Sequence, residues 1–225
     1  MVLSPLEMEA LRLSLQVAVW AVVVSLPLGI AVAWVLVRKP FPGRILLDGI
    51  VHLPLIVPPV VVGYLLLVVM GRRGFVGAWL WDTFQISIAF SWQGAAAAAG
   101  VMAFPLLVRS IRQELEAVDP KLEQAACTLG ARPFMVFVTV TLPLIVPGIL
   151  TGAILAFARC LGEFGATITF VSNIPGETRT LPLALYTAVQ SPGGEGAAIR
   201  LVMISVALAL GALITSEYLT RRIRK

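Results

Sequence analysis

Several apolar runs in this sequence are long enough to cross a lipid bilayer, and no other feature constrains the fold as strongly. A transmembrane helix needs roughly 20 mostly apolar residues to cross about 30 Å of hydrocarbon. Five segments meet this requirement, at residues 14–37, 50–70, 88–108, 134–158 and 199–219. Only 13% of the 225 residues are charged, whereas about 25% is usual in a soluble domain. We therefore expect an integral membrane protein.

The apolar runs are continuous, and this pattern predicts helices. A transmembrane β-barrel, the alternative spanning structure, requires alternating segments of about ten residues. We predict an all-α polytopic membrane protein with about five transmembrane helices, forming one domain over residues 10–220. Prolines inside the runs indicate either ordinary membrane-helix composition or kinked helices that open and close a pathway. They are Pro27, Pro54, Pro58, Pro59, Pro105, Pro143 and Pro147.

Lysine and arginine are unequally divided between the two sets of loops that five spans would create. One set holds eleven: Arg38, Lys39, Arg44, Arg109, Arg112, Lys121, Arg132, Arg221, Arg222, Arg224 and Lys225. The other holds six: Arg12, Arg72, Arg73, Arg159, Arg179 and Arg200. Because basic loops tend to stay in the cytoplasm, we expect the N-terminus outside and the C-terminus inside. Nucleic-acid binding is not expected, since no basic run is interleaved with aromatic residues.

Residues 161–190 are apolar in two short pieces that polar residues interrupt. Neither piece is long enough to span alone. We expect external or partly re-entrant structure buried against protein, because irregular backbone at membrane depth needs such cover. If this segment crossed, four basic C-terminal residues would move outside, which argues against a crossing.

The stretch Asp119–Gly130 is polar, lies between long apolar runs and has the pattern of a short helix. Asp119 is a suitable N-cap, Pro120 suits the first helical position, and Gly130 is a suitable stop. One face is apolar with helical spacing, and consists of Leu122, Ala125, Ala126 and Leu129. These residues alone allow two interpretations: an amphipathic interfacial loop, or a cytoplasmic docking helix that passes motion to the next span.

The spacing downstream favours the docking helix. Residues 124–143 resemble the motif E-A-A-x3-G-x9-I-x-L-P. The positions compared with it are Gln124, Ala125, Ala126, Gly130, Val140, Thr141, Leu142 and Pro143. That motif is typical of importer permeases of the ATP-binding cassette (ABC) superfamily. Gln124 replaces the glutamate, with Glu123 adjacent, and Val140 replaces isoleucine. The resemblance implies that residues 119–132 form a coupling helix seated in a cleft of a cytoplasmic ATPase. The implied coupling residues are Glu123, Gln124, Ala125, Ala126, Gly130, Leu142 and Pro143.

Two further stretches, Leu47–Gly77 and Phe157–Tyr186, are similar to those of molybdate permeases of the same superfamily. Sulfate and thiosulfate permeases are close relatives of these, and tungstate is a further alternative cargo. The resemblance implies a homodimer in the lipid of the cytoplasmic membrane, an ABC ATPase and a separate extracytoplasmic molybdate-binding protein. Residues 71–90 and 172–195 are candidate docking surfaces for that binding protein.

Residues around 159–173 have the chemistry to contact a tetrahedral dianion in transit. Glycine permits close backbone approach, and amides and hydroxyls donate to oxyanions. The candidates for the pathway are Arg159, Gly162, Glu163, Gly165, Thr167, Thr169, Ser172 and Asn173. Arg159 and Arg179 are placed to attract an anion at the external mouth. Glu163 opposes an anion, and we expect it to pair with Arg159 at i,i+4 spacing.

Other functions have less support in the sequence. There is no G-x4-G-K-[ST] pattern, so ATP hydrolysis is expected in a separate subunit and the chain itself is expected not to be an enzyme. An intramembrane enzyme needs a nucleophile with a histidine, paired aspartates or a metal. His52 is the only histidine and is expected to be a hydrogen-bonded interface residue, while Asp48, Asp82 and Asp119 are expected in loops.

Cys127 and Cys160 lack the spacing of metal ligands, and both are expected to be small apolar fillers. We expect neither a metal nor another cofactor. A passive channel would not require the 119–143 pattern, and it would transport its solute without an ATPase.

Overall fold

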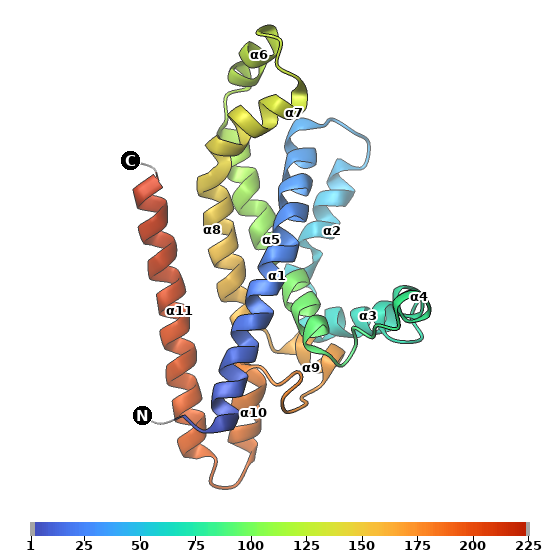
Figure 1. Ribbon diagram of the computed structural model, residues 1–225, viewed down its shortest axis with the longest axis vertical. Coiled ribbons are helices and arrows are strands. Elements are labelled where there is room, and N and C mark those ends of the chain that lie inside the picture. Colours follow the sequence, from blue (N-terminus) through green and yellow to red (C-terminus); the bar gives the residue numbers. More distant parts are fainter. Residues whose placement is uncertain (1–2, 224–225) are drawn as a thin grey trace.

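The computed structural model describes residues 3–223, and every regular element within this range is helical (Figure 1). The elements are α1 (Pro5–Arg38), α2 (Arg44–Ile56), α3 (Pro59–Met70), α4 (Phe75–Phe84), α5 (Trp92–Ala117), α6 (Pro120–Thr128), α7 (Pro133–Val136), a π-helical turn η1 (Phe137–Thr141), α8 (Leu142–Leu161), α9 (Gly165–Val171), α10 (Leu181–Gln190) and α11 (Glu195–Ile223). The predicted all-α class is confirmed.

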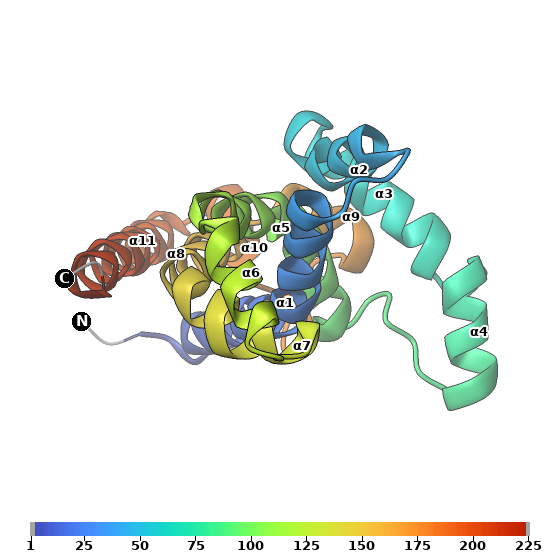
Figure 2. The same cartoon turned by 90° about the horizontal axis from the view of Figure 1, so that it is seen from above.

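Helix α5 is the centre of a bundle in which α1 and α8 pack against it and α11 packs against α8 (Figures 1 and 2). Small residues allow these close approaches, as is common between membrane helices. A Cβ at Gly29 of α1 would lie 2.9 Å from Leu107 of α5, and one at Gly152 of α8 would lie 3.2 Å from the same side chain. The fully buried Leu107 therefore lies against glycines of both neighbouring helices.

Four of the described helical stretches are long and apolar enough to cross a membrane. They contain the spans expected at 14–37, 134–158 and 199–219, and most of the one expected at 88–108. The last of these begins later than expected, because the Ser91 side chain accepts the amide of Gly94 and caps α5 at Trp92. It also continues to Ala117, beyond the apolar run.

The span expected at 50–70 is not one continuous helix. It is divided into α2 and α3, and the chain bends by 117° between them. Val57 and Pro58 have extended backbones, with ψ angles of 139° and 134°. Each precedes a proline, and a following proline disfavours the α conformation. Of the two interpretations left open for the prolines, helix distortion applies at Pro58 and Pro59, and the distortion there is a break rather than a kink.

Beyond this break, α3 and α4 extend sideways from the bundle (Figures 1 and 2). The inner part of α3 packs against α9. Gly63 makes this possible, since a Cβ there would lie 2.5 Å from the carbonyl oxygen of Ala166. As expected, residues 161–190 form only short helices, α9 of 7 residues and α10 of 10, which are too short to cross about 30 Å.

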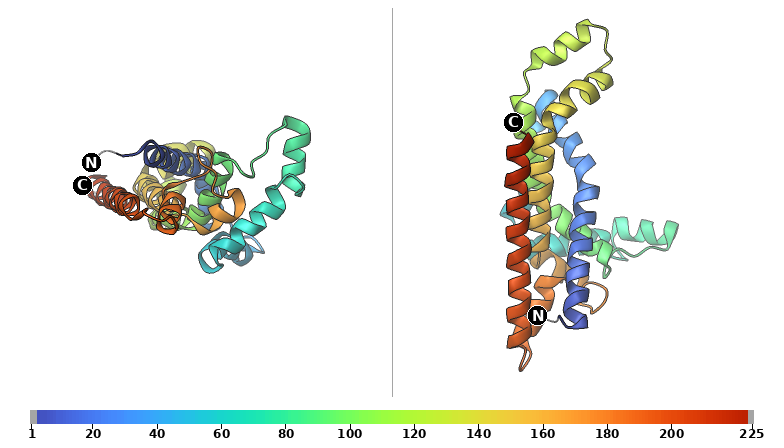
Figure 3. Two further views of the ribbon diagram at one scale, coloured as in Figure 1. Left: turned by 90° about the horizontal axis from the view of Figure 1, so that it is seen from below. Right: turned by 60° about the vertical axis from the view of Figure 1, so that its left-hand side comes forward.

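The bundle has two distinct ends. The beginning of α1 lies near α10, whereas α11 ends on the side where α6 is found (Figures 1 and 3). Ser4 and Glu7 cap the start of α1 reciprocally, and Glu7 also pairs with Arg200 of α11 at 2.7 Å. This pair joins the first and last helices at the end opposite α6.

Candidate coupling site

Helix α6 lies at the tip of the molecule and has the predicted ends (Figure 1). The Asp119 carboxylate accepts the amide of Lys121 at 2.9 Å, and Pro120 occupies the first helical position. The helix ends at Thr128, and Gly130 follows with a φ angle of +87°. The left-handed conformation is one that glycine adopts readily. The capping and the stop were thus predicted correctly, although the helix is shorter than the expected 119–132.

The predicted apolar face of α6 is largely uncovered. Leu122 is 50% exposed and Leu129 is 88% exposed. Gln124, Ala125 and Gly130 are also exposed, while Ala126 is half-buried. A Cβ at Gly130 would meet no atom within 4 Å. Exposed leucines of this kind, on a short helix outside the bundle, are suited to contact with another protein.

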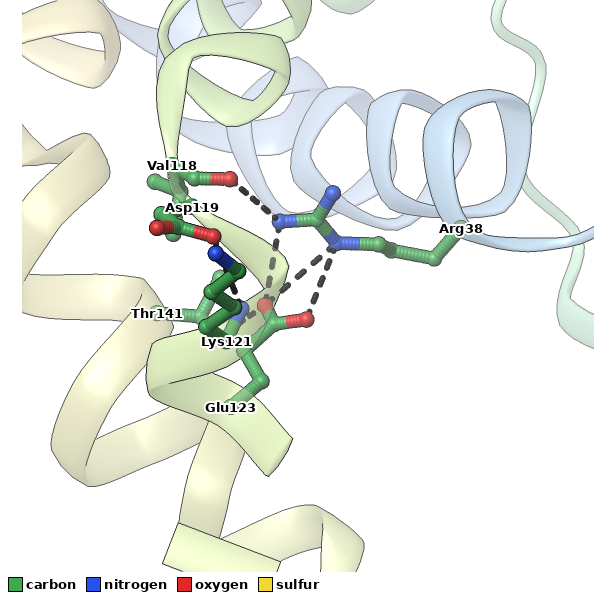
Figure 4. Close-up of polar contacts among 6 residues, drawn as sticks. All are labelled: Arg38, Val118, Asp119, Lys121, Glu123 and Thr141. Carbon is green, nitrogen blue, oxygen red and sulfur yellow. Dashed lines mark hydrogen bonds and ion pairs between the residues drawn. The ribbon is translucent and has the colours of Figure 1, made fainter. Parts of the chain in front are cut away.

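Glu123 has a different environment from these neighbours and points inward (Figure 4). Its carboxylate lies 3.1 Å from Nε of Arg38, at the end of α1. The hydroxyl of Thr141 donates to the same carboxylate at 2.7 Å. Arg38 also donates to the carbonyl of Val118 at 3.4 Å. Neither partner could be predicted from the sequence, because Arg38 is 85 residues and Thr141 18 residues from Glu123.

Helix α6 leads directly into the fourth span. Arg132 precedes a helical stretch that begins at Pro133 and continues through η1 into α8. The π-helical turn contains Thr141 and ends just before Leu142 and Pro143, the last two residues of the coupling motif. Such π-bulges in α-helices frequently occur at functional sites.

The expected pair between Arg159 and Glu163 is present in the second group of candidate residues. The guanidinium of Arg159 lies 2.7 Å from the Glu163 carboxylate, whose side chain is only 2% exposed. Glu163 also accepts the amide of Ala166 at 2.9 Å, at the start of α9. This carboxylate is therefore satisfied within the protein.

The remaining pathway candidates differ in exposure and in hydrogen bonding. Thr167 is buried, and the hydroxyl of Thr169 donates to Gly165 within its own helix. Asn173 accepts from Arg179 at 2.8 Å and donates to Thr187 at 2.8 Å. Exposed members of the set are Gly162 and Ser172.

Gly165 serves helix packing. A Cβ at this position would lie 2.8 Å from the ring of Pro59. Its lack of a side chain thus allows α9 to approach the start of α3.

The expectation that Asp48 and Asp82 lie in loops is wrong, because they lie in helices α2 and α4. His52 is hydrogen-bonded, as expected, and its ring is 3.4 Å from the Asp48 carboxylate. Arg112 of α5 pairs with the same carboxylate at 2.9 Å, so this histidine belongs to a polar cluster between α2 and α5. Its Nδ1 lies 2.9 Å from the carbonyl of Asp48.

The two cysteines also differ from each other. Cys160 is a buried filler, as expected, but Cys127 is exposed on α6. The expectation for Cys127 is wrong because α6 has no buried residue, which the apolar character of cysteine does not indicate. Among the described residues, no group of three or more histidine, cysteine, aspartate or glutamate side chains could hold a metal ion.

Comparison with known proteins agrees with this architecture. The sequence profile of the family described as "Binding-protein-dependent transport system inner membrane component" matches residues 25–225. The chain belongs to this family. It is accordingly a multi-pass inner membrane protein and a permease subunit.

Individual relatives extend the similarity to the whole chain. "Molybdenum transport system permease protein ModB" of Escherichia coli (strain K12) is 64% identical over 98% of this chain and 96% of the relative. The protein of that name in Haemophilus influenzae is 56% identical over 98% of this chain and 96% of the relative. "Sulfate transport system permease protein CysW" of Synechocystis is 37% identical over 95% of this chain and 77% of the relative.

Solved structures have the same fold at much lower identity. A bacterial ABC transporter that imports alginate contains a chain with a TM-score of 0.75, 18% identity and coverage of 99% of this chain and 82% of the other. The MetNI methionine ABC transporter contains one with a TM-score of 0.67, 16% identity and coverage of 96% and 94%. The chain therefore has the transmembrane fold found in these ABC importers.

Proposed function

We propose that this chain is the permease subunit of an ATP-driven ABC importer that carries molybdate across the cytoplasmic membrane. The geometry that carries the proposal is α6, a short helix at one tip of the bundle with two leucines 50% and 88% exposed. The cargo is inferred from the ModB relatives, which are 64% and 56% identical over nearly the full length. The sulfate relative is more distant, at 37%.

Such a permease works with partners. The proposed assembly is a homodimer of this chain, forming a single transmembrane domain per subunit over residues 10–220, with a cytoplasmic ABC ATPase under each copy. An extracytoplasmic binding protein would deliver molybdate to the opposite end, where residues 71–90 and 172–195 are the candidate surfaces. The charge asymmetry of the loops supports an external N-terminus and a cytoplasmic C-terminus.

In this arrangement, ATP binding draws the ATPase subunits together and moves each α6 with them. Residues Gln124, Ala125, Ala126 and Gly130 form the contact with the ATPase. The movement passes through the connection at 129–132 into the helical stretch Pro133–Leu161, where Leu142 and Pro143 lie beside the π-helical turn. Alternation of the paired spans then opens the pathway to each side in turn.

The pathway itself needs only weak binding, because a solute that enters must also leave. Hydroxyls and backbone amides of residues 162–173 supply donors for an oxyanion. Arg159 is half-buried and its charge is balanced by Glu163, so it offers attraction without a deep binding site. High affinity for molybdate would belong to the binding protein.

Uptake of labelled molybdate by cells that lack this chain, with and without its restoration, tests the proposal. We expect restoration to return uptake that excess sulfate does not suppress. Suppression by sulfate would identify a sulfate permease instead. Uptake that persists without any ATPase would indicate a passive channel.

A substitution beside the exposed face of α6 distinguishes coupling to the ATPase from insertion into the membrane. Gly130→Trp should insert normally in the membrane but lose both the bound ATPase and molybdate uptake, because the indole would occupy the open contact surface and strain the backbone at a φ angle of +87°. If the Gly130→Trp chain still retains the ATPase and supports uptake, α6 is not the coupling helix.

A further inference from the structure

Glu123 is the only acidic residue of α6, and its carboxylate points toward Arg38 and Thr141 (Figure 4). Its side chain is 21% exposed, and that of its partner Arg38 is 17% exposed. In contrast, Gln124 and Ala125, the next two residues, are exposed. Glu123 therefore differs in environment from the residues that face a partner.

The contacts of Glu123 join three separate elements. Arg38 at the end of α1 donates from Nε and Nη2 to the carboxylate at 3.3 and 3.2 Å. Thr141, the last residue of η1, donates to it at 2.7 Å and is itself buried. Hydrogen bonds to an ionised group are about twice as strong as neutral ones.

Little else attaches α6 to the rest of the protein. None of its residues is buried, so it lacks the apolar packing that normally fixes a helix against its neighbours. Its other attachments are contacts with the neighbouring α7 and η1 and the two chain connections at 118–119 and 129–132. A force on α6 would rotate the helix about these connections unless a side chain held it.

We propose that Glu123 and Arg38 are positioning residues that link α6 rigidly to α1 and to η1. This inference rests on the proposed function, since it assigns Glu123 to transmission and not to direct contact with the ATPase. Displacement of α6 then reaches two spans, α1 through Arg38 and α8 through Thr141. Without the link, ATP is hydrolysed while the spans move less.

The test compares molybdate transported per ATP hydrolysed in proteoliposomes that contain the chain with the ATPase that copurifies with it. Glu123→Gln removes the charge but keeps an oxygen for Thr141, and Arg38→Glu reverses the charge of the partner. For both variants we expect unchanged affinity for the ATPase and a ratio lowered by at least about five-fold, the lower end of typical coupling effects. The reciprocal exchange Arg38→Glu with Glu123→Arg should recover most of the ratio.

A matched control is available at the same end of the bundle. Glu116→Gln removes the ion pair with Arg112, which lies within α5 and joins no two elements. This variant should leave the ratio unchanged. Loss of folded protein alone would lower uptake and hydrolysis together, so it would not change the ratio either.

A second measurement does not require the ATPase. Amide hydrogen exchange across 120–131 should be faster in Glu123→Gln and in Thr141→Val than in the wild-type chain, and it should slow again in the reciprocal exchange. An unchanged ratio in Glu123→Gln, or a parallel fall in ATPase affinity, would overturn the link. If the wild-type chain binds no ATPase, the proposed function fails, while hydrogen exchange still tests the attachment of α6.

Discussion

At Gly130 the backbone conformation disfavours most side chains, although there is space for one. Its φ angle is +87°, but a Cβ would meet nothing within 4 Å. A β-branched residue is strained at positive φ, whereas asparagine tolerates it. We expect Gly130→Val to destabilise the end of α6 by about 1–2 kcal/mol and Gly130→Asn to have little effect. Amide exchange at 125–131 measures this, and equal exchange in the two variants would contradict it.

Arg159 compensates a buried carboxylate, and this role can be separated from any contact with the solute. Removing one partner of a buried ion pair typically costs about 3–5 kcal/mol, and the Glu163 side chain is only 2% exposed. Arg159→Ala should therefore lower the thermal unfolding midpoint of the detergent-solubilised protein markedly. Arg159→Lys, which keeps the charge, should lower it less. An unchanged midpoint for Arg159→Ala would show that Glu163 does not need this partner.

The contrast between two ion pairs shows what could be predicted residue by residue. Arg159 and Glu163 are four positions apart, so helical spacing alone brings them together. Arg38 and Glu123 are 85 residues apart, and only the packing of the bundle places them in contact. The ends of α6 could be predicted because they depend on residues that are close in sequence. The inward direction of Glu123 could not, because it depends on a residue that only the packing of the bundle brings near.

At the scale of elements, the division of the expected span 50–70 depends on local chemistry and on packing. Pro58 and Pro59 marked the place of the break in the sequence, but the 117° angle also depends on α9, which lies against Gly63. We expect Gly63→Ala to destabilise the protein by about 1–3 kcal/mol through overpacking, since its Cβ would lie 2.5 Å from the Ala166 carbonyl oxygen.

The control for this substitution lies in the adjoining helix. Gly49 of α2 has nothing within 4 Å of a Cβ, so Gly49→Ala should be neutral or stabilising by about 0.5–1 kcal/mol through the higher helix propensity of alanine. Thermal unfolding of both variants in the same detergent gives the comparison. Equal destabilisation of the two would mean that the α3–α9 contact does not hold the broken span in place.

At the scale of the whole molecule, the loop charges and the bundle give the same division into two ends. The loops richer in lysine and arginine include those next to α6, and α11 ends on the same side (Figure 1). The two cysteines can report which side this is. Cys127 is exposed on α6, whereas Cys160 is buried and its Sγ donates to the carbonyl of Ala99 at 3.4 Å.

A membrane-impermeant maleimide should therefore label the chain at Cys127 in inside-out vesicles and leave it unlabelled in intact spheroplasts. Cys127→Ala should abolish the labelling, Cys160→Ala should preserve it, and saturating ATPase should protect the thiol because it covers α6. Labelling from outside the cell would place α6 on the external side. A cytoplasmic ATPase would then be unable to reach it, and the coupling role of the helix would have to be abandoned together with the proposed orientation.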